Sequence, residues 1–162
     1  MVSGTILGEY SSAAQADTLW KAAFLDGHKL LPKILPGIIS SIEILEGDGA
    51  AVGTVRKTNF TDANKDCKFV KDRVEVMDPE NHTVKYCILD GGVLGVKVKS
   101  YSVGFCVTST KEGGCLVKIE IVYESNGESL LPEEDANDLK QGILSMLKAV
   151  DAYLVANPDA YA

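Results

Sequence analysis

The spacing of apolar residues changes twice along this chain, and this change restricts the possible folds more than any other feature. Between about residues 39 and 124, apolar side chains recur at every second position, in runs separated by turn-forming residues. Residues 3–11 show the same alternation. Short turns between consecutive strands predict an antiparallel meander. The six later runs are Ile39–Glu46, Thr54–Thr61, Cys67–Met77, Thr83–Asp90, Val96–Ser109 and Cys115–Glu124.

Two short segments near the start have helical spacing instead. Ala13–Leu25 is expected to form a helix, and Ser11 or Ser12 can cap its N-terminus. A second short helix, from about His28 to Leu35, is expected to end at Pro36-Gly37, where proline lacks an N–H group. The sharp break between them predicts two helices arranged in a V.

The longest helix is expected near the end of the chain, from Pro132 to about Ala156. It begins with a proline and three acidic residues, which suit the positive end of a helix dipole, and it carries one apolar stripe. Gly142 lies inside this helix, where glycine costs about 1 kcal/mol relative to alanine. Either a neighbour packs closely against Gly142, or the missing side chain leaves space that is used.

These elements predict one α+β domain over residues 1–162, in which a curved antiparallel sheet faces a long helix. One helix cannot fill the concave face of a twisted seven-strand sheet. Either bulky side chains fill the remaining space or a cavity remains.

Charge argues against several classes of partner. The net charge is −7 and the isoelectric point is about 4.8, so DNA is not expected as a partner and RNA is disfavoured. No apolar run approaches the ~18 residues of a membrane span, and the N-terminus lacks the pattern of a signal peptide. We therefore expect a cytoplasmic protein without a membrane partner, and a monomer.

Four segments together resemble the plant pathogenesis-related class 10 proteins, the birch pollen allergen family. They are Trp20–Gly49 (WKAAFLDGHKLLPKILPGIISSIEILEGDG), Phe69–Asp78 (FVKDRVEVMD), Ile88–Gly92 (ILDGG) and Lys148–Ala162 (KAVDAYLVANPDAYA). The resemblance covers nearly the whole chain. It implies a helix-grip fold, in which seven strands wrap the long helix, and an internal cavity for cytokinins, sterol-like hormones, flavonoids, other phenolics or alkaloids.

The resemblance and the strand alternation together suggest which side chains line that cavity. The lining is mostly apolar, with polar groups at Thr58, Cys67, Tyr86, Asp90 and Tyr101 that could orient a ligand. The alternative is an ordinary packed core, in which the tyrosine hydroxyls bond to backbone carbonyls. The complete expected set is Ala23, Phe24, Ile39, Thr58, Phe60, Cys67, Phe69, Val84, Tyr86, Ile88, Asp90, Tyr101, Val103, Phe105, Gly142, Ile143 and Met146.

The glycine-rich stretch LEGDGAAVGT invites comparison with a phosphate-binding loop. A P-loop requires lysine and serine or threonine at the start of a helix after its glycines. Here Gly47, Gly49 and Gly53 are followed by a segment with strand alternation, which offers no helix dipole to an anion. We therefore interpret the loop as a hairpin connection. The family has a similar loop, but this chain carries one extra residue before Gly53.

Neither histidines nor cysteines form a recognisable metal or catalytic motif. The four cysteines contain no CxxC pair, and the expected strand register pairs none of them with another, so neither a metal site nor a disulfide is expected. Free thiols fit a reducing cytoplasm. His28 lies early in the second helix, where it could line an entrance, and His82 follows a turn, where we expect it to be solvated. We expect no cofactor.

Ribonuclease activity, which has been ascribed to the family, is poorly supported. The glutamate proposed for it falls at Lys99, although Asp151 and Tyr153 retain the C-terminal pair. General acid–base cleavage needs a carboxylate and a base held together.

Two further functions remain as alternatives. Some relatives catalyse alkaloid condensation inside the cavity, for which Asp90 is the best acidic candidate because Lys118 and Glu120 are expected to point outward. Related hormone receptors inhibit a phosphatase, but LDGGVLGV lacks their serine-glycine-leucine-proline-alanine gate. Reversible binding of a hydrophobic small molecule in defence or stress remains the principal hypothesis.

Overall fold

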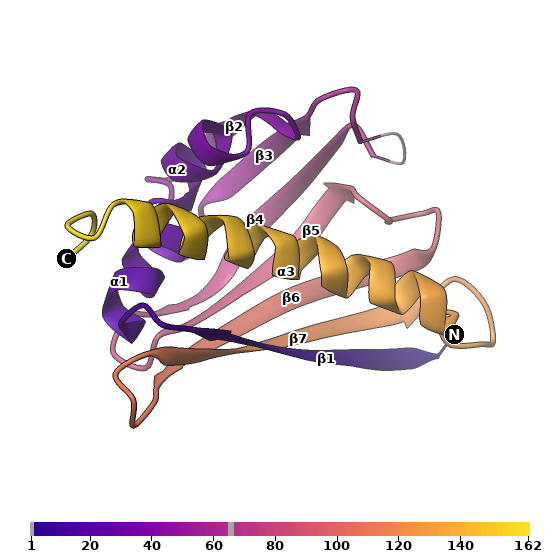
Figure 1. Ribbon diagram of the computed structural model, residues 1–162. Coiled ribbons are helices and arrows are strands. Elements are labelled where there is room, and N and C mark those ends of the chain that lie inside the picture. The colour runs from indigo at the N-terminus through magenta and orange to yellow at the C-terminus, as the bar shows by residue number, and fades with distance from the viewer. Residues whose placement is uncertain (1, 65–66) are drawn as a thin grey trace.

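The computed structural model describes residues 2–64 and 67–162, and it consists of one curved sheet with a long helix across its concave face (Figure 1). The sheet has seven antiparallel strands in the order β1-β7-β6-β5-β4-β3-β2, which confirms the predicted helix-grip architecture. The strands are β1 (Ser3–Ser12), β2 (Ile39–Glu46), β3 (Val55–Phe60), β4 (Phe69–Asp78), β5 (Thr83–Gly91), β6 (Val98–Ser109) and β7 (Cys115–Ser125).

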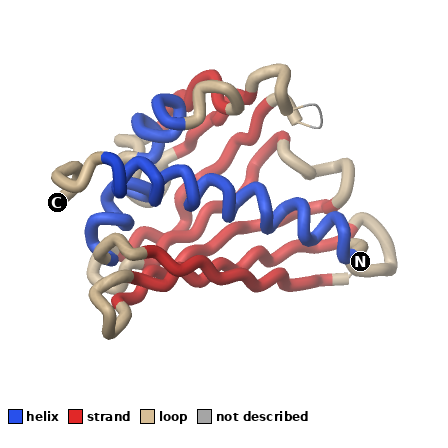
Figure 2. Tube along the Cα trace, viewed as in Figure 1, coloured by secondary structure: helices blue, strands red, loops and turns tan. Residues whose placement is uncertain are grey.

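Short helical segments connect β1 to β2 and lie at one end of the sheet (Figure 2). They are α1 (Ala16–Trp20), the π-helical turn η1 (Lys21–Leu25) and α2 (Gly27–Ile34). The expected first helix is thus shorter than predicted and changes to π geometry. The expected serine cap is wrong, because Gln15 occupies the N-cap position and Ser12 instead binds Asp151.

The long helix α3 (Glu133–Ala156) begins after Pro132, as the sequence predicts. Its carboxylate at Asp151 accepts hydrogen bonds from Tyr10 (2.7 Å) and Ser12 (2.5 Å), which fasten the helix to β1. Among the described elements, the α3 backbone approaches β1, α1, η1 and α2, and it lies farther from β2 to β5 (Figure 1).

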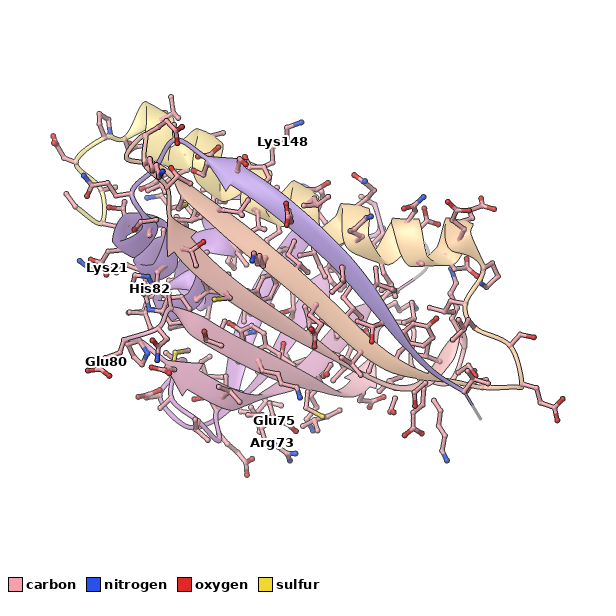
Figure 3. The ribbon with its side chains drawn as sticks, turned by 90° about the horizontal axis from the view of Figure 1, so that it is seen from below. Lys21, Arg73, Glu75, Glu80, His82 and Lys148 are labelled. Atoms are coloured by element: carbon pink, nitrogen blue, oxygen red, sulfur yellow. The ribbon has the colours of Figure 1, made fainter. Side chains whose placement is uncertain are left out.

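Aromatic side chains fill the end of the sheet beneath the short helices. The ring of Phe24 lies 5.3 Å from that of Trp20 and 4.8 Å from that of Phe105, measured between centroids. His82 stacks on Trp20 at 5.3 Å, and its Nε2 lies 3.5 Å from Asp17, so the expectation of a solvated His82 is wrong. Figure 3 shows His82 beside the short helices. The β4–β5 turn is thereby held against α1.

Candidate functional site: the concave face beneath the long helix

The concave face of the sheet carries most of the side chains that alternation assigned to the interior. Val84, Tyr86, Val103 and Phe105 are buried and belong to one apolar cluster. Ala23, Phe24 and Ile39 join the same cluster from the helical end of the molecule and the start of β2. The alternation therefore predicts the direction of these side chains correctly, and a ligand-binding role for them stays a prediction.

A second group of interior apolar side chains is only half-buried. Phe60 on β3, Ile88 on β5, and Ile143 and Met146 on α3 all pack against the core cluster and keep part of their surface accessible. Ile42 on β2 does the same, opposite the half-buried Thr58. Apolar surface that faces inward and remains accessible to solvent is what a guest molecule of similar polarity could cover.

Two of the expected lining residues, Asp90 and Phe69, do not face the interior. Asp90 is exposed, pairs with Lys71 on the sheet, and accepts a hydrogen bond from the Gly91 amide at 2.8 Å. Register shifts by one residue at Leu89, since Lys71 pairs with Asp90 whereas the next residue, Asp72, pairs with Ile88. The bulge reverses the alternation, so the predicted inward carboxylate at Asp90 is wrong.

Phe69 was expected on the same wall and instead lies on the outer face. It pairs with Asn59, and its ring centroid lies 4.9 Å from Lys57 Nζ. Neighbouring Val70 pairs with Thr58 and takes the inward position. Cys67 precedes β4, where strand alternation does not apply, and its half-buried thiol donates to the Phe69 carbonyl at 2.8 Å.

Gly142 is exposed, and a Cβ atom built there would meet no heavy atom within 4 Å. The close packing considered for this glycine is therefore wrong, and open space lies beside the helix at this position. Gly142 precedes Ile143, one of the half-buried side chains.

A buried ion pair on the same wall was not anticipated from the sequence. Arg56 on β3 donates from Nε (3.1 Å) and Nη2 (3.2 Å) to the two carboxylate oxygens of Asp72 on β4. Both residues are less than one-tenth exposed. The guanidinium carbon also lies 4.4 Å from the ring centroid of Tyr86 on β5. The sequence did contain an indication of this pair. Alternation along the strand puts Arg56 on the same inward face as Thr58 and Phe60, so a cation lies among mainly apolar positions.

Arg56 and Tyr86 perturb each other's ionisation, and Asp72 acts on both. Burial raises the pKa of Tyr86 to about 12, against the influence of Arg56, which favours the phenolate. Burial alone would lower the pKa of Arg56, but Tyr86 and Asp72 outweigh it and raise that pKa. At neutral pH the cluster therefore holds a charged guanidinium and a neutral phenol.

Tyr101 contributes the second interior phenol. Burial raises its pKa to about 12, and a hydrogen bond from the Val93 backbone acts in the opposite direction. Its hydroxyl lies against Gly92, where a Cβ atom would come within 2.2 Å of the oxygen. Because Val93 uses an acceptor position of the hydroxyl, the O–H proton is left to donate.

The glycine-rich loop joins β2 to β3, as the strand–loop–strand pattern predicts. Gly47, Gly49 and Gly53 have φ angles of +87°, +111° and +92°, which only glycine adopts without strain. Asp48 fixes the turn, because one of its carboxylate oxygens accepts from the amides of Ala50 (2.9 Å) and Ala51 (2.8 Å). No helix follows this loop, so it lacks the anion-binding geometry of a P-loop.

The weak catalytic candidates at the C-terminal end of the chain do not converge. Asp151 is bonded to Tyr10 and Ser12, whereas the ring of Tyr153 faces Lys33 Nζ at 5.4 Å. Lys118 and Glu120 are exposed, as predicted. Asp151 thus has a structural task that joins α3 to β1.

Residues 2–64 and 67–162 contain no group of three or more histidine, cysteine or acidic side chains placed to hold a metal ion. The four cysteines, all within these ranges, are free. No described helix has the length and hydropathy needed to cross a membrane.

Comparisons with known proteins agree with this architecture. Residues 1–157 match the family model described as "Pathogenesis-related protein Bet v 1 family". Pathogenesis-related protein B of Petroselinum crispum is 39% identical over 149 residues, covering 92% of this chain and 95% of the relative.

Two solved structures superpose over almost the full length. The crystal structure of Ara h 8.0201 has a TM-score of 0.83 at 29% identity, covering 96% of this chain and 99% of that one. Norcoclaurine synthase from Thalictrum flavum, in complex with dopamine and hydroxybenzaldehyde, has a TM-score of 0.75 at 26% identity, covering 96% and 88%. The chain therefore belongs to the Bet v 1 family of pathogenesis-related proteins.

Proposed function

We propose that this protein reversibly binds an apolar or amphipathic small molecule between the sheet and α3, as a carrier or store in plant defence or stress. The observation that carries this proposal is the group of half-buried apolar side chains on the concave face, represented by Phe60, Ile88, Ile143 and Met146. Ligand binding is also typical of the family to which the chain belongs.

The chemistry of this surface favours a mainly hydrocarbon ligand with one or two polar groups. Burying about 300 Å² of ligand carbon at roughly 25 cal/mol per Å² would contribute about 7.5 kcal/mol, before the cost of immobilising the ligand. Cytokinins, sterol-like hormones, flavonoids and other plant phenolics or alkaloids have this character. Tyr101 would orient such a ligand by donating its O–H proton, and Tyr86 would act similarly beside Arg56.

The test is displacement of a fluorescent apolar probe by a panel of these compounds. Ile143→Trp should fill part of the proposed site and weaken probe binding at least tenfold. Val155→Trp is the matched control, because Val155 lies on the same helix and is 72% exposed. Equal probe affinity in both variants and the unmodified protein would contradict the proposed site. Tyr101→Phe should weaken the binding only of ligands that carry a hydrogen-bond acceptor.

A second candidate, catalysis in the same interior, is favoured by the structural similarity to norcoclaurine synthase. The interior of this chain offers Tyr101 and the paired Arg56 and Asp72 as polar groups, whereas Asp90 is exposed and cannot serve there. Incubation with an arylethylamine and an aromatic aldehyde, followed by chromatography, tests this candidate. Product that forms with the unmodified protein and disappears in Tyr101→Phe would favour catalysis over simple binding.

The location of the protein is part of the proposal. Four free thiols suit a reducing compartment, so we propose that the protein acts in the cytoplasm. Fluorescent fusion imaging tests this location.

A further inference from the structure

The glycine-rich loop between β2 and β3 rests on the imidazole of His28, at the start of α2. A Cβ atom at Gly49 would lie 2.7 Å from Cε1, 2.9 Å from Nε2 and 3.2 Å from Nδ1 of this ring. The backbone at Gly49 therefore lies over the ring, with no room for a side chain between them. This contact joins the loop to the helix that closes one end of the interior.

The loop holds its own shape through Asp48, and it contacts α2 through His28. Asp48 accepts from the amides of Ala50 and Ala51, and the Thr54 hydroxyl lies 3.4 Å from the same oxygen. These bonds hold the pKa of the Asp48 carboxyl below its usual value, the Ala51 amide contributing most. The Asp48 carboxylate is therefore already committed to the loop backbone.

The environment of His28 disfavours its protonated form. Its Nδ1 is buried and has no hydrogen-bond partner among the described residues. Burial is the main cause that lowers the pKa of His28, and Lys29 and Arg56 act in the same direction. Asp26 and Asp48 oppose this effect.

Other elements packed against α2 supply no further partner for the imidazole among the described contacts. On β2, Glu43 accepts from Asn59 at 2.8 Å in an exposed position. On α3, Tyr153 faces Lys33. Asp26, the nearest carboxylate in the chain sequence, accepts from the hydroxyl of Tyr161 at 2.5 Å.

We propose that His28 is a pH-sensitive clasp: its neutral imidazole holds residues 47–53 against α2, and protonation releases them and weakens binding of the apolar ligand. The loop release stands on the His28–Gly49 contact and the unpartnered Nδ1 of His28, whereas the effect on affinity rests on the proposed ligand binding. A charged imidazole needs an acceptor for its Nδ1–H, and the closed arrangement provides none among the described residues.

The sign of the effect follows from proton linkage. A solvated histidine has a pKa of about 6.5, and the closed loop holds the His28 pKa below that value. The released state therefore takes up a proton first as pH falls, and closure is fully favoured only above about pH 6.5. Each unit of pKa difference between the two states shifts their equilibrium about tenfold.

The experiment uses nuclear magnetic resonance of the full chain between pH 7.5 and 4.5. The chain contains two histidines, so imidazole signals can be assigned with His28→Gln and His82→Gln. We expect the His28 midpoint to lie below 6.5, and the amide signals of Gly49 and Ala50 to move with the same midpoint. His28→Phe, which preserves a ring under Gly49, should remove this movement of the loop signals, and His82→Gln should leave it intact.

His28→Gln provides the second test, in case the phenylalanine variant does not fold. Loop signals that still move at the same midpoint in a folded His28 variant, or that do not move in the unmodified protein, overturn the clasp. Probe affinity measured at pH 7.5 and pH 5 completes the test. Failure to bind probe at pH 7.5 would contradict the proposed function, whereas the loop signals alone decide the clasp. Probe affinity that is equal at both pH values, despite loop release, overturns the link between clasp and ligand.

Discussion

The two halves of the concave face have the same alternating pattern but are filled differently. Beneath α1 and η1, the side chains of Trp20, Phe24 and Phe105 are almost completely buried. Away from this end, Phe60 on β3 and Ile143 on α3 itself face the same interior and are only half-buried. Among the strand residues, alternation turns both Phe105 and Phe60 toward the interior, and the helical segments packed nearby determine how far each ring is covered.

The position of α3 accounts for the difference. The bonds from Tyr10 and Ser12 to Asp151 hold its C-terminal half against β1, while its backbone remains farther from β2 to β5 among the described elements. The short helices lie at one end of the sheet (Figure 2), and Trp20 and Phe24 place their rings in the interior there. The packed half should therefore determine stability, and the half-buried side should determine what the protein binds.

The largest expected contrast between the halves comes from truncating one side chain in each. Phe24→Ala should lower the free energy of unfolding by about 3–5 kcal/mol, because it opens a cavity in a close-packed aromatic cluster. Ile143→Ala should cost about 1 kcal/mol, since part of the side chain is already exposed. Urea unfolding followed by circular dichroism measures both.

The effect of the two variants on probe binding should have the opposite order to their effect on the free energy of unfolding. Ile143→Ala should weaken probe binding more than Phe24→Ala does, when both are measured under conditions in which the variants are folded. Similar losses of stability in the two variants would contradict the division of the face into two halves.

The next largest effect is expected at the ion pair between the halves. Asp72→Asn should lower the free energy of unfolding by about 3 kcal/mol, because it leaves the Arg56 guanidinium buried without its carboxylate. The matched variant Arg56→Met with Asp72→Leu removes both charges and should recover most of that loss. Double-mutant analysis of urea unfolding measures the coupling, and additive losses would show that the pair contributes nothing specific.

Sequence patterns predict the fold well because its elements follow periodicity and turn chemistry, which are local. They predict the inward direction of four side chains correctly for the same reason, namely those of Val84, Tyr86, Val103 and Phe105. The outward direction of the Asp90 side chain could not be predicted, because the bulge at Leu89 is set by pairing with β4.

Phe69 and Arg56 illustrate a second limit of sequence patterns. A phenylalanine on the outer face and an arginine on the inner face reverse the ordinary preference of each residue type. Their positions become explicable only through partners on neighbouring strands, Lys57 for the ring and Asp72 for the guanidinium. The charge of the guanidinium gives no indication of its carboxylate partner sixteen residues away.

A smaller effect is expected where α3 is fastened to the packed half. Asp151→Asn removes a charged acceptor that serves two hydroxyls, and it should cost about 2 kcal/mol. Burial and Asp151 together raise the pKa of Tyr10 to about 12, so the variant should bring that pKa toward 10. Ultraviolet titration of tyrosine measures the shift. Loss of stability without any change in tyrosine ionisation would contradict the assigned contact.

The smallest expected effect lies on the open side of the same helix. Gly142→Ala should raise the free energy of unfolding by about 1 kcal/mol, because alanine favours the helix and its Cβ meets no atom within 4 Å. Gly47→Ala is the opposite control, since Gly47 has a φ of +87° and a Cβ there would lie 2.6 Å from the Thr54 hydroxyl oxygen. Thermal unfolding measures both. A destabilised Gly142→Ala would contradict the open surroundings of this helix position.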